Sequence, residues 1–218
     1  MADPSIHCPE CGAPATFRGT AISVVCEYCG STIVRTGADV RLIGKVSAVL
    51  DQGSPILLGG RGAFERVPFE IVGRLQLRHA RGLWSEWYLL FADGSDGWLA
   101  DAQGSYYLVR KVAASDPRGL EFGHLWLGDE ARLQERSLRV VERRVATYQG
   151  AEGSLPFEAT PERGYASVDL MDEDGRFATL DYSDDDAARE RPVVYFGRAV
   201  ELPELGLRPL RRFEGWDG

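Results

Sequence analysis

The sequence predicts a mainly β protein in which a small cysteine-rich ribbon precedes two small antiparallel β-barrel or sandwich-like modules. All four cysteines lie within the first thirty residues, in two Cys-x-x-Cys pairs. Beyond residue 36, alternating or apolar runs are interrupted by Gly, Asp or Pro roughly every eight to fifteen residues, a spacing typical of sandwiches and small barrels. We therefore expect a ribbon over residues 1–36, modules over residues 38–115 and 120–212, and a tail over residues 213–218.

The ribbon prediction rests on the cysteine pairs, which are Cys8 with Cys11 and Cys26 with Cys29, each followed directly by glycine. A tight turn aims the two thiolates of a pair at one point, and glycine relieves the strain of that turn. Four thiolates suit tetrahedral Zn²⁺, and paired spacing of this kind predicts a metal site rather than disulfides. A closed four-thiolate site has no open coordination position, so we expect a structural zinc. Iron in a rubredoxin-like site is the alternative, since four sulfurs accept either metal.

The first module contains the aromatic stretch of residues 84–109, which alternates with the period of two of a β-strand. Trp87 and Phe91 fall on one strand face, and an Asp-Gly hairpin is expected to bring Trp98 back across that face. These three rings are predicted to be core residues, because large rings fill a small barrel. Trp84 is expected nearer the rim.

An aromatic cage for a cation is the alternative for the same stretch. Such a cage combines aromatic faces with a nearby carboxylate. The candidate ligand-binding residues are Trp84, Glu86 and Asp96.

The second module repeats the pattern of strand, Asp-Gly turn and strand over residues 166–182. Residues 129–148 fit helical and strand spacing equally well, so the residues alone leave that segment open. Acidic turns at residues 172–174 and 184–186 could collect a cation, although solvated turns explain them more simply.

Composition narrows the functional classes. The 218 residues carry a formal net charge of −8, and the ribbon loop has Arg18 as its one cation. Both observations argue against nucleic-acid binding and leave a nucleic-acid-binding ribbon protein as the lesser alternative. No run of about 18 apolar residues and no signal peptide is present, so we expect a cytoplasmic protein without an integral membrane segment. No nucleophile, base and orienting residue form a recognisable set, and no phosphate loop occurs, so no enzymatic activity is expected.

Several motifs together resemble the bacterial family catalogued as domain of unknown function 4178, over roughly residues 38–210. The resemblance implies an all-β fold, which favours a strand over residues 132–148, and many members carry the same N-terminal zinc ribbon. It implies no catalytic residue, because the family has no established activity. Genes of the family tend to lie beside those for aminopropyltransferase-like, small membrane and membrane-remodelling proteins. The residues that carry the resemblance are Val72-Gly73-Arg74, Trp84-x-Glu86-Trp87 through Asp93-Gly94, Gly97-Trp98-Leu99, Gly150-x-x-Gly153-x-Leu155-Pro156-Phe157, Phe177 through Tyr182, and Tyr195-Phe196-Gly197-Arg198.

Two functional hypotheses follow. The first is a non-catalytic adaptor or accessory factor that docks a protein partner, with membrane-remodelling or aminopropyltransferase-like proteins as candidates. The second is a sensor or enzyme accessory subunit that recognises a small polyamine-like cation. A deep aromatic and acidic pocket would favour the second, and a flat surface with an open strand edge would favour the first.

Overall fold

The computed structural model describes residues 3–37, 39–45, 48–80, 82–113, 118–160, 164–183 and 191–213. Those residues are almost entirely β, which confirms the predicted fold class. The one described helix is the short 3-10 turn η2 (Leu202–Leu205). Among the described residues, no helix has both the length and the apolar character needed to cross a lipid bilayer.

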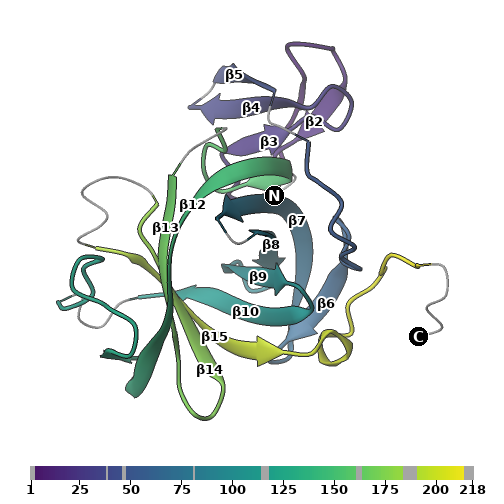
Figure 1. Ribbon diagram of the computed structural model, residues 1–218. Coiled ribbons are helices and arrows are strands. Elements are labelled where there is room, and N and C mark those ends of the chain that lie inside the picture. The colour runs from purple at the N-terminus through teal and green to yellow at the C-terminus, as the bar shows by residue number, and fades with distance from the viewer. Residues whose placement is uncertain are drawn as a thin grey trace.

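Eight antiparallel strands form a closed barrel (Figure 1). In order around the barrel they are β7 (Val67–His79), β8 (Gly82–Phe91), β9 (Asp96–Ala102), β10 (Ser105–Val112), β15 (Val193–Val200), β14 (Arg176–Asp181), β13 (Gly164–Met171) and β12 (Arg136–Leu155). Pairing of β12 with β7 closes the circle. A barrel of eight strands leaves room inside for side chains and at most one small ligand.

The two predicted modules are the two halves of this single barrel. Each half is a four-stranded meander, β7–β10 and β12–β15, and neither closes on itself. Four strands are too few to close, and each meander would keep two edges with unpaired backbone groups. Pairing of β10 with β15, and of β7 with β12, removes all four edges at once.

Residues 129–148 fit both helical and strand spacing in the sequence, and in the structure they form β-strands. A short hairpin joins β11 (Glu130–Leu133) to the long strand β12, and a β-bulge at Val141 interrupts the pairing of β12 with β13. Leu138 and Val140 pack in a core, whereas Val141 and Val145 are exposed. The bulge breaks strict alternation in β12, which is why its apolar residues also fit helical spacing.

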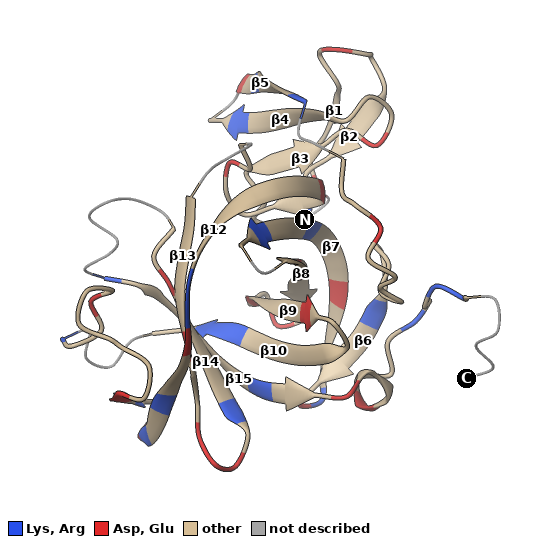
Figure 2. Cartoon of the chain, in the orientation of Figure 1, with Lys and Arg blue, Asp and Glu red and all other residues tan. Residues whose placement is uncertain are grey.

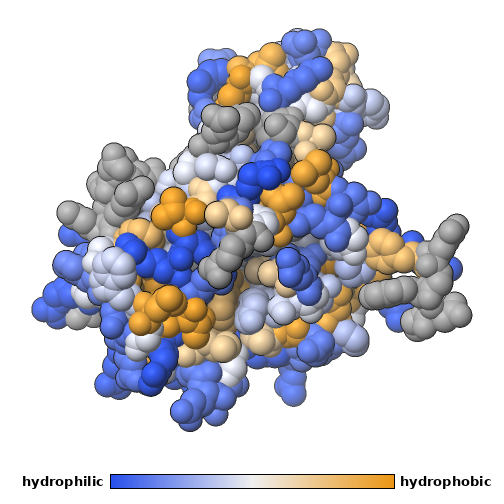
Figure 3. All heavy atoms as spheres, viewed as in Figure 1, coloured by the Kyte–Doolittle hydropathy of each residue, from blue (hydrophilic) through white to orange (hydrophobic). Residues whose placement is uncertain are grey.

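The barrel wall is packed on both faces. One apolar cluster fills the lumen. A second covers the outside of β12–β15, beneath the segment that contains Leu120, Phe122 and Leu125. A third covers the outside of β7–β10, beneath β6 (Arg61–Phe64), the preceding loop and η2. The face shown in Figure 3 is mainly hydrophilic, with separate apolar patches.

The burial predicted for three aromatic rings is confirmed, but the predicted faces are partly wrong. Trp87, Phe91 and Trp98 are all buried. Trp87 and Phe91 belong to the outer core, whereas Trp98 lies in the lumen opposite Tyr88. The hairpin register places Trp98 beside Tyr88, one residue from the expected partner, and a shift of one residue reverses the face. Trp84 was expected near the rim, yet it is only 5% exposed and also lies in the lumen.

The ribbon packs on one end of the barrel (Figure 1). Its strands are β1 (Ser5–His7), β2 (Pro14–Thr16), β3 (Ser23–Val25), β4 (Ser31–Thr36) and β5 (Asp39–Lys45). The end of β12 extends out of the barrel and pairs with β3 through Ser154 and Leu155. Val25 of the ribbon joins the luminal cluster, and Arg18 forms a 2.8 Å ion pair with Glu70 of the barrel. The ribbon therefore shares part of its core with the barrel.

Candidate functional site

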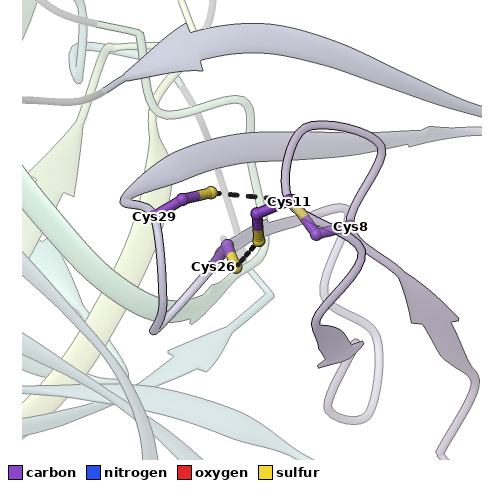
Figure 4. Close-up of side chains that lie close together, drawn as sticks. All are labelled: Cys8, Cys11, Cys26 and Cys29. Atoms are coloured by element: carbon purple, nitrogen blue, oxygen red, sulfur yellow. Dashed lines mark hydrogen bonds between the residues drawn. The ribbon is translucent and has the colours of Figure 1, made fainter.

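The four cysteines sit in two turns with the same hydrogen bonds. In the first turn the amide of Gly12 donates to the carbonyl of Cys8 at 2.8 Å, and in the second the amide of Gly30 donates to Cys26 at 2.9 Å. Both glycines have φ values above +70°, a conformation that costs glycine little and other residues more. These turns bring all four sulfurs to one point (Figure 4).

The sulfur geometry fits one tetrahedral metal ion. The ligand atoms of Cys8, Cys11, Cys26 and Cys29 all lie within 4.8 Å of one another. The Cys8–Cys29 and Cys11–Cys26 sulfur pairs are each separated by 3.7 Å. Metal–sulfur bonds of about 2.3 Å in a tetrahedron require sulfurs about 3.8 Å apart, so the spacing matches. Hydrogen bonds from Ser31 lower the pKa of the Cys29 thiol to about 6, whereas burial and the neighbouring thiols raise the pKa of Cys11 to about 12. The four thiols therefore titrate as one coupled group, and a bound metal would compete with their protons.

A second candidate site is a cavity of about 60 Å³ inside the barrel. Aromatic rings make up much of its wall, including a Tyr107–Phe177 stack with centroids 4.3 Å apart and a Trp84–Tyr165 pair at 6.1 Å. All eight barrel strands contribute lining residues, among them Leu75, Glu86, Trp98, Tyr107, Arg144, Asp169, Thr179 and Tyr195.

Glu86 is the polar centre of one side of this cavity. Its Oε1 accepts a 2.8 Å hydrogen bond from the indole nitrogen of Trp84, and its Oε2 accepts none from the described residues. Burial raises the pKa of the Glu86 carboxyl to about 7, although the Trp84 hydrogen bond and the charge of Arg144 act in the opposite direction. Glu86 therefore titrates near neutral pH, which is common at functional sites.

The other charged groups of the lumen already have partners. Arg144 forms ion pairs with Asp169 and with Glu142, and Thr179 donates a 2.9 Å hydrogen bond to Asp169. The guanidinium of Arg144 also lies 5.0 Å from the centre of the Trp84 ring. Asp181 accepts a 2.8 Å hydrogen bond from the amide of Ser183. Burial strongly raises the pKa of the Tyr165 hydroxyl, so that residue stays neutral.

Of the three residues proposed for a cage, the structure brings two into the cavity. Trp84 and Glu86 line it, whereas half-buried Asp96 does not. Burial raises the pKa of the Asp96 carboxyl as well. Asp96 lies outside the cavity because of its position along β9.

The luminal residues of the second half were not predicted as site residues from the sequence; they are chiefly Arg144, Asp169, Thr179 and Asp181. One signal was available: polar residues alternate with buried apolar ones at Asp169, Thr179 and Asp181. That alternation marks one strand face as polar, but it does not say that the face points into a closed lumen.

The acidic turn at residues 172–174 joins β13 to β14 and is the red loop at the lower end of β14 in Figure 2. Arg136 binds Asp172 at 2.7 Å and Asp174 at 3.0 Å. An arginine therefore occupies the place that a cation would take. The second acidic turn, at residues 184–186, lies outside the described residues.

Comparison with known protein families identifies the family to which the chain belongs. The model of the family described as Domain of unknown function (DUF4178) matches residues 57–202, a range that includes all eight barrel strands. The chain belongs to this family. No curated protein and no solved structure matches the chain.

Proposed function

We propose that the protein is a non-catalytic binding protein whose barrel lumen takes a small organic cation. The observation that carries this proposal is Glu86, a carboxylate that lines a cavity with aromatic walls and whose Oε2 accepts no hydrogen bond from the described residues. A cation over aromatic faces and beside a carboxylate gains from both interactions, and the gain is larger where water is excluded. This proposal follows the second hypothesis from the sequence, a sensor or enzyme accessory subunit that recognises a small polyamine-like cation.

The cysteine site complements this role as a structural zinc site. Four thiolates fill the coordination shell of the metal and leave no position for a substrate. Zinc bound by Cys8, Cys11, Cys26 and Cys29 would hold together a ribbon that is too small to be stable on its own core. Because this ribbon covers one end of the barrel, the metal would support the lumen indirectly. Reduced thiolates agree with a cytoplasmic location.

An adaptor role has one observation in its favour. β5 pairs with β4 on one side, and no strand of the described chain pairs with its other side. An exposed edge of this kind can accept a strand from a protein partner. Adjacent amides of β5 point to opposite sides of the strand, so proline at whichever of Arg41 and Leu42 points its amide away from β4 would block such pairing. Co-purification of a partner from the native host, lost in that variant, would establish it.

Calorimetric titration of the purified full chain tests the cation hypothesis. The probes are butylamine, 1,4-diaminobutane and tetramethylammonium, at pH 8, where most of the Glu86 carboxyl is ionised. We expect saturable 1:1 binding of at least one probe. Absence of binding by all three would overturn the proposal.

A further inference from the structure

We propose that the open edge of β5 pairs antiparallel with β5 of a second copy of the chain. This inference goes beyond the proposed ligand and does not depend on the lumen. The ribbons of the two copies would then share one continuous sheet across a two-fold axis.

The strand β5 is the outermost strand of the ribbon and presents an open edge. It pairs with β4 on one side, and no other strand of the described chain pairs with it. None of its seven residues is buried, whereas four of the six residues of β4 are. Leu42, at the centre of β5, keeps 37% of its surface exposed. The unpaired backbone groups of such an edge form a template for a further strand.

The charges at the two ends of β5 indicate that the further strand is β5 itself. The strand begins at Asp39 and ends at Lys45, and both residues are exposed. Neither side chain forms an ion pair or a hydrogen bond with the described residues. When two identical strands pair antiparallel, the start of each lies against the end of the other. Asp39 of each copy therefore meets Lys45 of the other, whereas parallel pairing would place like charges together.

The same arrangement brings the apolar centres of the two edges together. With the two-fold axis at Leu42, Asp39 lies opposite Lys45 and Leu42 lies opposite its own copy. Contact between the two leucines removes apolar surface from water, and opposite charges across the strands add to the pairing. A bulge at Ile43 changes the register between β5 and β4 locally, but it does not change which ends of the two strands meet.

Sedimentation velocity on the full chain in about 0.15 M salt, from about 5 to about 500 µM protein, tests the pairing. One strand pair is a small interface, so we expect a weak dimer that dissociates on dilution. Asp39→Lys and Lys45→Asp should each weaken the dimer by about tenfold or more, because like charges then meet at both ends. An equimolar mixture of the two variants should dimerise about as well as wild type, because opposite charges again face each other.

The matched control is Lys111→Asp, the same change at an exposed position of β10, which should leave the dimer unchanged. Asp39→Lys also moves the net charge of the chain from −8 towards zero, so a general charge effect would strengthen association in that variant. The inference is overturned if wild type stays monomeric over the whole range, or if Asp39→Lys dimerises as well as wild type. It is equally overturned if the mixed variants fail to pair, or if Lys111→Asp weakens the dimer as much as Lys45→Asp does.

Discussion

Replacement of Glu86 by glutamine is expected to stabilise the protein, and to do so only above mildly acidic pH. Burial raises the pKa of this carboxyl from 4.5 to about 7 in the folded protein. Each pKa unit corresponds to about 1.4 kcal/mol, so ionisation of Glu86 costs the folded state up to about 3 kcal/mol. Glutamine keeps the oxygen that accepts the Trp84 hydrogen bond and carries no charge to bury.

The sign of the pH dependence follows from the direction of the shift. Because the pKa of Glu86 is higher in the folded state, the wild-type protein is not penalised below about pH 4.5 and loses stability as the pH rises to about 7. The advantage of Glu86→Gln should therefore be small at pH 4.5, grow between pH 4.5 and 7, and stay constant at about 3 kcal/mol above that range. The luminal groups that set this pKa are Trp84, Arg144, Asp169 and Asp181.

Urea unfolding of wild type and variant at pH 4.5, 6 and 8 measures the difference in the free energy of unfolding. Glu173→Gln is the matched control, since Glu173 is exposed in the β13–β14 turn and should show no pH-dependent difference. A Glu86→Gln difference that does not change between pH 4.5 and 8 would refute the argument that the carboxyl is buried at a cost. A variant less stable than wild type at pH 8 would show that the charge is stabilised by its partners.

Three further predictions concern the lumen, the core and the metal. Butylamine affinity should fall about tenfold per pH unit below about pH 7, because the amine requires ionised Glu86, and a flat calorimetric profile from pH 5 to 8 would contradict this. Trp87→Ala should lower the free energy of unfolding by about 3–5 kcal/mol. Trp98→Ala should lower it less, since the Trp98 ring borders a cavity, and denaturant melts that match wild type for both would show that neither ring is core. Elemental analysis should find about one zinc per chain, and iron or no metal would disprove the zinc assignment. Cys26→Ser should lose the metal and also lower the barrel's melting temperature, because Val25 packs in the luminal core.

The sequence by itself determined the local features of this protein. The Cys-x-x-Cys-Gly turns fold as predicted, because a turn depends on a few consecutive residues and on the backbone freedom of Gly12 and Gly30. Strand character and the burial of Trp87, Phe91 and Trp98 follow from alternation and ring size, which are also local.

Only the tertiary structure decided how the two halves of the chain combine. Each meander looks complete in sequence, and backbone groups at a strand edge do not reveal which strand will pair with them. Closure of β10 on β15 and of β7 on β12 turned two expected cores into one lumen. That closure brought Glu86 to the same cavity as Arg144 and Asp169. Strand register decided on which face of the barrel wall Trp98 lies. Trp98 pairs with Tyr88, and a displacement of one residue would have placed the Trp98 ring outside the barrel.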